Sequence, residues 1–393
     1  MKRFLKVLSY VAVALLASAL TLTGTLYWGR SMEAPRSGES KLNQLQDILD
    51  TYFIEDVDRT ALEDAAAKAM IQATGDRWSY YIPAADYQSY RERAENAYVG
   101  VGITISPIEN PAGFEIVEVV PGGPAAEAGL EVHDVLIQIE GKSCADLGME
   151  GTKDLVRGEE GTSVRVTVLR DGQEKEFSVT RRRFETPVAT YELLDSGYGL
   201  ITIENFESKC AEETLAAIEA LTAQGAKGLI FDVRFNPGGF KDELVKVLDY
   251  LLPEGPLFRS VTYDGQESTD YSDAAHLELP MAVLVNQDSY SAAEFFAAAL
   301  QEYGVAKVVG TQTSGKGYFQ NTFRLLDGSA AAISTGKYFT PHGNSLAGVG
   351  ISPDVPAEVE EKTNAAIYYG ELEPADDPQI QAAISALNSA VEP

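Results

Sequence analysis

The sequence has few of the residues that build metal sites and disulfide frameworks. Its two cysteines, Cys144 and Cys210, lie far apart and form no CxxC pair, so a single disulfide is open but nothing requires it. The three histidines, His133, His276 and His342, each stand alone, which argues against a zinc site. We therefore expect neither a metal nor a cofactor.

Positive charge is also scarce. The 393 residues include 31 lysines and arginines against 59 acidic residues, which gives a net charge of −28. Nucleic acid is therefore not an expected partner, because no basic face is left to neutralise phosphates. The acidic excess is typical of a solvated surface, and the length leaves room for two or three domains with a proper core.

One long apolar run is present, at the N-terminus. Lys2, Arg3 and Lys6 precede a largely apolar stretch over residues 7–28. A basic start followed by about 22 such residues predicts an export signal that is long enough to span a bilayer. We favour an uncleaved anchor over residues 1–30, although Ala17-Ser18-Ala19 leaves cleavage open. The expected protein is single-pass in the cell membrane with its remainder outside the cytoplasm, or secreted if the signal is cleaved.

Residues 31–95 are predicted to form a polar linker followed by a helical region. Apolar residues recur at helical spacing over residues 45–53 and again over 62–70. The region carries no chemistry of its own. It is interpreted as a packing or dimerisation element, which leaves a homo-oligomer open.

A β pattern with turn signals begins near Tyr98. Residues 121–130 read Pro-Gly-Gly-Pro-Ala-Ala-Glu-Ala-Gly-Leu, and Asp134 and a strand ending Ile-Glu-Gly-Lys at 139–142 follow. This combination resembles a PDZ domain over residues 96–184. The resemblance implies that one loop presents backbone amides to the C-terminal carboxylate of a peptide, which adds as a strand. That loop comprises Val99, Gly100, Val101, Gly102 and Ile103.

Residues 185–358 alternate strand and helix patterns, which predicts an α/β core with loops at the C-terminal ends of its strands. One buried strand ends in Asn236-Pro237-Gly238-Gly239, and another is followed by Ser291 and an apolar helix. Backbone N–H groups at a helix start are unpaired and stabilise a developing negative charge, so Ser291 is a candidate nucleophile. Taken singly, an ordinary N-cap is the simpler interpretation of this serine.

Lys316 lies between Gly315 and Gly317, after a third buried strand. Burial lowers the pKa of a lysine by disfavouring its charged form, which turns the amine into a general base. A solvated loop lysine is the simpler interpretation of this residue alone. A phosphate-binding loop is set aside, because Gly317 stands where that motif needs a serine or threonine.

Taken together, these stretches resemble the carboxy-terminal processing proteases, the tail-specific serine peptidases, over about residues 40–390. The matching stretches are residues 289–294, 310–311, 315–317 with Gln320, 337–341, 348–355 and 377–379.

The resemblance implies a role for each matched residue. Ser291 would be the nucleophile, Lys316 its base, and Gln320 the residue that orients the lysine. The amides of Ala292 and of Gly238 or Gly239 would form the oxyanion hole.

One other serine could be the nucleophile, and three residues differ from the family pattern. Ser289 is a rival nucleophile, but the family's spacing to Glu294 selects Ser291. Tyr290, Phe235 and Ser314 depart from the family pattern and put the shape of the subsites in doubt.

The implied fold is a crotonase/ClpP-like α/β protease core with an inserted β-rich PDZ domain. The expected parts are a transmembrane anchor (1–30), a linker and helical region (31–95), the PDZ domain (96–184), the protease core (185–358) and a C-terminal helical tail (359–393). Arg157, in the turn after a PDZ helix, is a candidate regulatory link to the core, although an exposed arginine there is usually just solvated.

The expected function is that of a serine endopeptidase that captures exposed C-termini or unfolded proteins through its PDZ domain and cleaves them outside the cytoplasm. The alternative is a membrane-tethered PDZ adaptor with an inactive or gated protease core. A Ser-His-Asp triad would need His276 or His342, and neither sits in a recognisable motif. A Ser-x-x-Lys pair, Ser334 with Lys337, needs a helical turn where a strand is predicted. A crotonase-like thioester enzyme would explain neither Lys316 nor the PDZ pattern.

Overall fold

The structure is a computed structural model that describes residues 16–22, 40–108 and 113–391. The chain divides into two compact units, residues 1–69 and residues 70–393. Most of the predicted membrane anchor lies outside the described residues, although residues 16–22 are helical. Within the described ranges, no helix combines the length and the apolar character needed to cross a membrane.

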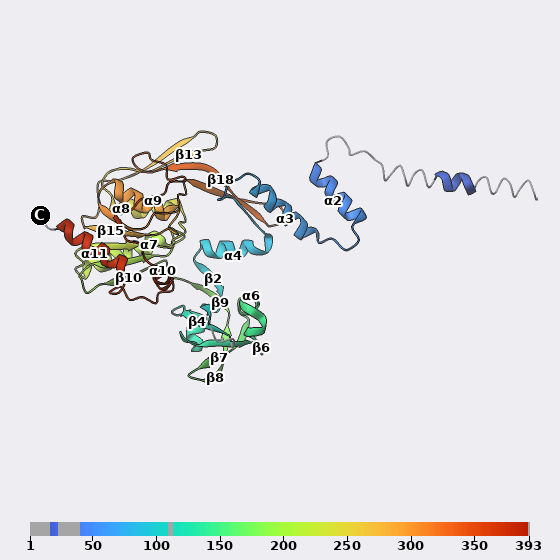
Figure 1. Cartoon of the computed structure of the whole chain (residues 1–393), viewed down its shortest axis with the longest axis horizontal. Coiled ribbons are helices and arrows are strands. Elements are labelled where there is room, and N and C mark those ends of the chain that lie inside the picture. The colour runs from blue at the N-terminus through green and yellow to red at the C-terminus, as the bar shows by residue number, and fades with distance from the viewer. Residues whose placement is uncertain (1–15, 23–39, 109–112, 392–393) are drawn as a thin grey trace, which may run out of the picture. The chain divides into compact units, whose positions relative to one another are not determined.

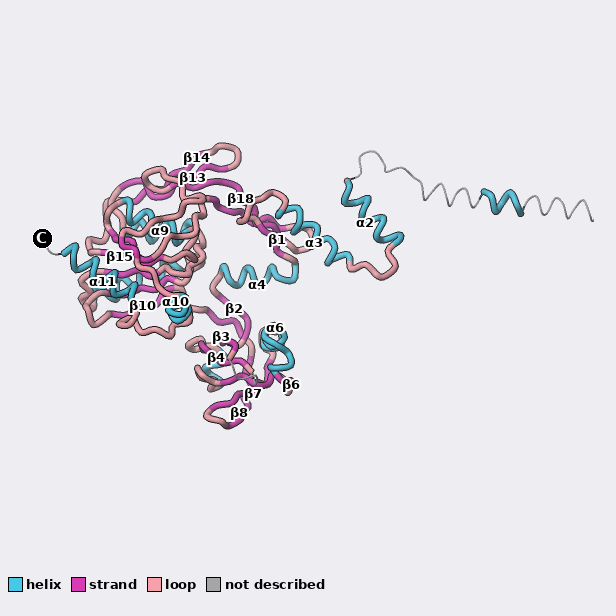
Figure 2. The backbone as a smooth tube through the Cα atoms, in the orientation of Figure 1, coloured by secondary structure: helices cyan, strands magenta, loops and turns pink. Residues whose placement is uncertain are grey.

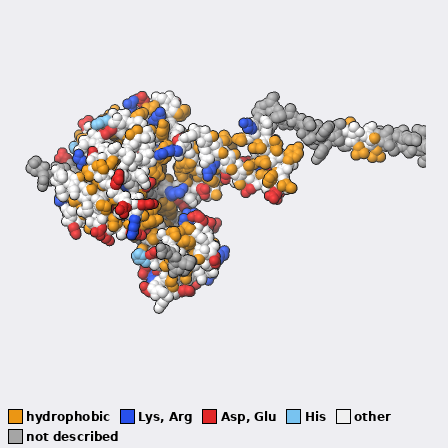
Figure 3. Space-filling model, viewed as in Figure 1, with side chains coloured by type: hydrophobic (Ala, Val, Ile, Leu, Met, Phe, Trp, Pro, Cys, Tyr) orange, Lys and Arg blue, Asp and Glu red, His pale blue; other side chains and the backbone are white. Residues whose placement is uncertain are grey.

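The first unit contains helix α2 (Lys41–Tyr52) and the start of helix α3 (Arg59–Gln72). Ser40 caps α2, because its hydroxyl accepts the N–H of Asn43 at 3.2 Å. The apolar side chains of α2 stay exposed, and hydrophobic side chains gather over this helix in Figure 3. The helical patterns predicted around residues 45–53 and 62–70 are therefore both present.

The β-rich part of the second unit follows helix α4 (Ala84–Ala94). Strand β2 (Ala97–Gly100) pairs with β9 (Arg182–Glu185), and a separate sheet has the order β3–β4–β5–β7–β8 with β6 beside β5. Helices α5 (Pro124–Ala128) and α6 (Cys144–Val156) belong to this part. The strands of the separate sheet are β3 (Ile103–Pro107), β4 (Phe114–Val119), β5 (Val135–Ile139), β6 (Lys142–Ser143), β7 (Ser163–Arg170) and β8 (Gln173–Thr180).

Two strands of the central sheet of the α/β core, β10 and β15, are labelled in Figure 1. The sheet has the order β10–β11–β12–β15–β16–β19. Its first pair is antiparallel and the remaining neighbours are parallel. The strands are β10 (Ala189–Leu193), β11 (Gly199–Ile203), β12 (Leu229–Asp232), β15 (Met281–Val285), β16 (Ala306–Gly310) and β19 (Val355–Pro356).

Helices cover both faces of this sheet, because successive residues of a strand point to opposite sides. Phe231 and Val283 pack into a cluster with helices α7 (Cys210–Ala223), α8 (Lys241–Leu251) and α9 (Ala292–Glu302). Ile230 packs on the other face against helix α11 (Pro378–Val391). Both faces are therefore buried, as the continuous apolar strands of the sequence predict.

A second sheet lies over the core and contributes residues to the site described below. Its order is β1–β18–β13–β14, and β17 also pairs with β18 (Figure 2). Ser334 and Lys337 both lie in β18, so they share no helical turn. The strands are β1 (Tyr80–Ile82), β13 (Gly255–Thr262), β14 (Glu267–Ser272), β17 (Tyr318–Arg324) and β18 (Ala330–Phe339); helix α10 (Glu361–Tyr368) precedes α11.

Both cysteines are free and buried, so the disulfide that the sequence left open does not form. Cys144 packs in the core of the β-rich part, whereas Cys210 packs in the core of the α/β part.

Candidate active site

Ser291 follows β15 and directly precedes α9, with φ 60° and ψ −121°. An ordinary N-cap is extended, as Ser40 is at φ −66° and ψ 149°. A non-glycine residue in a sparsely populated region costs about 1–3 kcal/mol and persists only where its surroundings hold it. The backbone of Ser291 is therefore held in a strained turn that an ordinary capping serine does not need.

Ser289 is engaged in a different way. Its buried hydroxyl donates to the Val233 carbonyl at 2.7 Å and accepts the Asn286 N–H at 3.0 Å. A hydroxyl with both partners inside the protein holds the turn together and has no access to a substrate. The geometry thus favours Ser291 over its rival.

Glu294 joins the start of α9 to the loop that carries Lys316. Its side chain is fully buried, and one carboxylate oxygen accepts the Thr313 hydroxyl and the Gly315 N–H, both at 2.6 Å. The other oxygen accepts the N–H groups of Ser291 at 3.1 Å and of Lys316 at 2.9 Å. Charge-assisted bonds of this kind are stronger than neutral ones. One carboxylate therefore fixes the backbones of both predicted dyad residues.

The Lys316 amine lies among aromatic rings. Its Nζ atom is 5.1 Å from the ring centre of Trp78 and 5.9 Å from that of Tyr290. Burial lowers the pKa of Lys316 to about 8, although the carboxylates of Glu294, Asp76 and Glu207 oppose this shift. Burial desolvates the amine, and Nζ has no hydrogen-bond partner among the described residues, so it is available to accept a proton.

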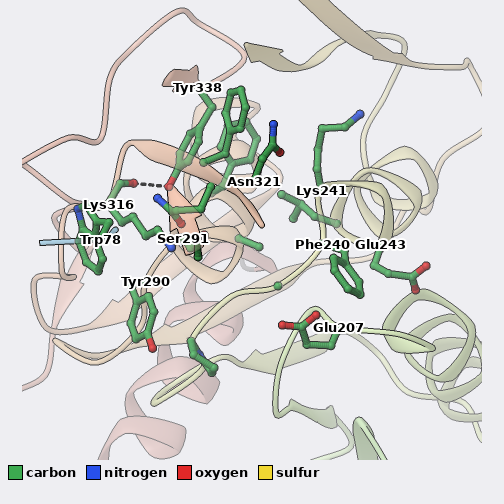
Figure 4. A pocket seen from close by; sticks show the side chains of 18 of the residues that line it. Trp78, Glu207, Phe240, Lys241, Glu243, Tyr290, Ser291, Lys316, Asn321 and Tyr338 are labelled. Carbon is green, nitrogen blue, oxygen red and sulfur yellow. Dashed lines mark hydrogen bonds between the residues drawn. The ribbon is translucent and has the colours of Figure 1, made fainter. Parts of the chain in front are cut away.

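Tyr338 contacts both parts of the predicted dyad. Its hydroxyl donates to the backbone carbonyl of Lys316, as the dashed line in Figure 4 shows. Burial raises the pKa of this phenol, and a hydrogen bond with Ser291 opposes the rise. Tyr338 therefore stays protonated and positions both residues.

Two of the three predicted oxyanion donors are free. The Gly238 N–H donates to Asn236 Oδ1 at 2.8 Å, so this amide is already engaged. The amides of Gly239 and Ala292 have no acceptor in the described part of the chain, and Ala292 N–H lies at the start of α9. A Cβ on Gly238 would lie 2.6 Å from Ser291 Cβ, so only glycine fits there. Gly238 thus permits the close approach, whereas Gly239 and Ala292 are the available donors.

A cavity of about 900 Å³ joins these groups. Its lining includes Ser291, Lys316, Gln320, Gly239 and Ala292, and Figure 4 shows Ser291 between Lys316 and Phe240. Gln320 does not bond to Lys316: its amide nitrogen donates to the Tyr318 carbonyl at 3.2 Å and to Ser334 Oγ at 3.0 Å. In this arrangement Gln320 holds strands β17 and β18 together beside the lysine.

The predicted peptide-binding loop runs from the last two residues of β2, Val99 and Gly100, to the first residue of the edge strand β3, Ile103. The Val101 carbonyl accepts the Ala125 N–H at 2.8 Å, and the Gly102 carbonyl accepts the Val120 N–H at 3.0 Å. With both carbonyls turned inward, the amides of Val101 and Gly102 have no acceptor among the described residues. Gly102 has φ 77°, which favours glycine. The loop therefore has the free donors that a carboxylate needs, beside a sheet edge that can accept a strand.

Arg157 is the C-cap residue of α6 and is exposed. Its guanidinium has no partner among the described residues. Arg181 is instead the buried arginine of this region and donates to the carbonyls of Leu155 and Val156, each at 2.8 Å. The structure thus gives Arg157 no contact with the core.

Trp78, Tyr338 and Glu207 line the cavity but were not among the predicted site residues. Trp78 lies just before β1, Tyr338 in β18 and Glu207 just before α7. Tyr338 falls inside a stretch that matched the family, so that match was a usable signal. Trp78 and Glu207 had none, because their positions depend on the packing of distant segments.

Two family models and several curated proteins match this chain. The model of "Peptidase family S41" matches residues 197–357, and a "PDZ domain" model matches residues 115–170. The chain is 32% identical to the "Carboxy-terminal processing protease CtpA" of Bacillus subtilis, over 91% of this chain and 78% of that protein. It is 29% identical to a "Probable CtpA-like serine protease" of Staphylococcus haemolyticus, over 88% and 71% of the two chains.

A solved structure shares the fold. A crystal structure described as that of an S41 protease from Bacteroides fragilis aligns with a TM-score of 0.57 over 92% of this chain and 93% of that one. The sequences are 15% identical, so this likeness concerns the fold alone.

Proposed function

The chain belongs to peptidase family S41 as a serine-type carboxy-terminal processing peptidase, and from this premise we propose that Ser291 and Lys316 form its catalytic dyad. One observation carries the proposal. A desolvated lysine amine and a serine in a strained turn are fixed by the same buried carboxylate, that of Glu294.

The reaction begins when the neutral Lys316 amine takes the proton of the Ser291 hydroxyl, whose oxygen attacks the scissile carbonyl carbon. The carbonyl oxygen becomes an oxyanion that the amides of Gly239 and Ala292 stabilise. As the C–N bond breaks, protonated Lys316 gives its proton to the leaving amine, and an acyl-enzyme remains. Water, deprotonated by Lys316, then hydrolyses the ester and returns the proton to Ser291.

The aromatic rings have a part in this cycle. Lys316 carries a positive charge between the two proton transfers, and the faces of Trp78 and Tyr290 stabilise a nearby cation. The first transfer needs a neutral amine. Burial favours the neutral form of Lys316 and lowers its pKa, whereas the rings favour the charged form and raise it. Gln320 acts as a positioning residue through β17 and β18.

We further propose that the substrate is a protein with an exposed or unfolded C-terminus, which the PDZ domain captures. Support comes from the loop Val99 to Ile103 with its free amides and from the edge strand β3. Residues 1–30 are proposed to anchor the protein in the membrane, with the peptidase outside the cytoplasm.

Cleavage of an unfolded protein by the full chain tests the dyad. The wild type should yield fragments, and Ser291→Ala and Lys316→Ala should each abolish them. Lys307→Ala is the matched control, because Lys307 is an exposed lysine of β16 and the variant should keep full activity. Fragments from both dyad variants would contradict the proposal.

A pair of peptides tests the PDZ role and the adaptor alternative. A peptide with a free C-terminal carboxylate should bind more tightly than its amidated twin, since only the carboxylate fits the amides of the loop. Equal affinities would overturn carboxylate capture. Carboxylate-dependent binding without any Ser291-dependent cleavage would favour the adaptor.

A further inference from the structure

We propose that Glu207 forms a subsite for a positively charged side chain of the substrate, next to the scissile bond. The inference rests on the proposed function, because it assigns a substrate preference to the same cavity. It concerns lysine and arginine side chains, which offer the cationic donors that a carboxylate accepts.

Glu207 is fixed beside the oxyanion loop. The Phe206 N–H donates to the Gly238 carbonyl at 2.8 Å, and the Phe240 N–H donates to the Phe206 carbonyl at 2.6 Å. A Cβ on Gly239 would lie only 2.6 Å from the Glu207 nitrogen. The side chain that follows Phe206 is therefore held next to the amide that receives the oxyanion.

The Glu207 carboxylate lines the same cavity as Ser291 and Lys316. Figure 4 shows it beside Phe240, across the cavity from Lys316 and Trp78. A peptide whose scissile carbonyl reaches Ser291 thus passes close to this carboxylate.

Glu207 lacks the partners that its charged neighbours have. Its Oε2 atom is buried and has no hydrogen-bond partner in the described part of the chain. Lys241 of the same cavity pairs with Asp270 at 2.9 Å, and Glu243 accepts the Ala211 N–H at 2.9 Å. Arg77 donates to the Ser314 carbonyl at 3.2 Å. A buried polar atom without a partner is uncommon, and a cationic substrate side chain that meets the Glu207 carboxylate from the cavity would offset the cost of burying its charge.

The surroundings leave Glu207 poised to ionise. Burial raises its pKa to about 7, and the charge of Lys316 opposes this rise. The other titratable groups that face it are the phenols of Tyr80 and Tyr98 and the thiol of Cys210. Lys316 must lose its charge to act as the base, so the carboxylate then depends on the substrate for a cation.

Matched peptides test the subsite in the full chain. Each pair differs only by lysine or norleucine at one position flanking the cleavage site, and kcat/KM is measured for both at pH 8. The wild type should prefer lysine at one position by about tenfold or more, which is typical of a hydrogen bond to a charged group. In Glu207→Gln the two rates should become equal. The ratio cancels any effect that acts through Ser291 or Lys316, because both peptides use the same dyad.

The pH dependence of that ratio is a second measurement. A carboxyl group with a pKa of about 7 is charged above and neutral below it, so the lysine preference should fade as the pH falls from 8 to 6. A preference that stays constant over this range would overturn a role for the Glu207 charge.

The outcomes separate the inference from the proposed function. Cleavage of both peptides without a preference, or a preference that Glu207→Gln retains, would overturn the subsite and leave the dyad intact. If Glu207→Gln fails to fold, Glu207→Asp replaces it and should keep the preference in weakened form; an unweakened preference counts against the subsite. Absence of Ser291-dependent cleavage from both peptides would remove the proposed function and the subsite together.

Discussion

The pKa values of two cationic side chains in the α/β core, Arg234 and Lys316, are shifted in opposite directions. Arg234 follows β12, and its guanidinium bonds to Asp232 at 2.9 Å, to Asp377 at 2.8 Å and to Gln379 at 2.9 Å. Burial alone would lower the pKa of Arg234, but the carboxylates of Asp232 and Asp377 raise it above its usual range. Lys316 follows β16 and makes no ion pair with a described residue, so burial outweighs the opposing charges of Glu294, Asp76 and Glu207 and its pKa falls.

The difference teaches what each cation is for. Arg234 is held permanently charged and joins the strand end to the segment that begins α11, which is a structural task. The pKa of Lys316 is lowered toward neutral pH by burial of the amine. This burial costs stability, but it provides a base. Removing Lys316 should therefore affect activity, whereas removing Arg234 should affect stability.

The largest effect is expected from Lys316→Met. The variant should lose about 10⁴-fold or more in kcat, because it removes the proposed base. Its stability should be equal to or above that of the wild type at neutral pH, since the buried amine has no ionic partner. Peptide kinetics and urea denaturation on the same sample measure both. A clear loss of stability would show that Lys316 holds the fold.

Arg234→Met should behave in the opposite way. Removing one member of a buried ionic network leaves Asp232 and Asp377 unpaired, which costs about 3–5 kcal/mol of unfolding free energy. Arg259→Met is the matched control, because Arg259 makes an exposed pair with Glu267 that contributes about 1 kcal/mol at most. Denaturation curves that place both variants close to the wild type would contradict a structural role for the Arg234 network.

Glu294→Gln should cost about 2–3 kcal/mol and reduce activity. An amide nitrogen cannot accept the backbone N–H groups that the carboxylate holds, so buried donors lose their acceptor. Glu219→Gln, an exposed position of α7, should leave both properties unchanged. An active and stable Glu294→Gln would mean that the loop of Lys316 is fixed by other contacts.

The smallest effect concerns the strained turn. Ser291→Gly should be more stable than Ser291→Ala by about 1 kcal/mol, because glycine tolerates φ 60°. The same two substitutions at Ser385 in α11 should rank the other way, since glycine weakens a helix interior. An identical ranking at the two sites in thermal unfolding would show that the Ser291 backbone is not strained.

The sequence predicted the α/β core and the β-rich part, because buried strands and their loop residues follow local patterns. Five of its candidate site residues line the cavity, namely Gly239, Ser291, Ala292, Lys316 and Gln320. The sequence left the second oxyanion donor open between Gly238 and Gly239, and Asn236 Oδ1 takes the amide of Gly238. Gln320 was expected to orient Lys316, but its amide reaches Ser334 of the neighbouring strand. Both outcomes depend on side-chain orientation, which spacing along the chain does not encode.

The three departures from the family pattern have partners that only the folded chain brings together. Tyr290 packs against Trp78 with ring centres 5.9 Å apart. Phe235 meets Tyr368 of α10 at 5.1 Å, and Ser314 accepts a bond from Arg77. Tyr290 lines the cavity together with Trp78 and Arg77, whereas Phe235 and Ser314 do not line it.

The most direct test of the account is a titration of the Lys316 amine. In protein labelled with ¹³C at the lysine ε-carbons, the Lys316 signal is the one that Lys316→Arg lacks. Its chemical shift should titrate with a pKa of about 8, and the cleavage rate should fall about tenfold for each pH unit below it, because only the neutral amine accepts a proton. A Lys316 signal that titrates near the ordinary value of 10.5 would contradict the claim that burial makes this lysine the base.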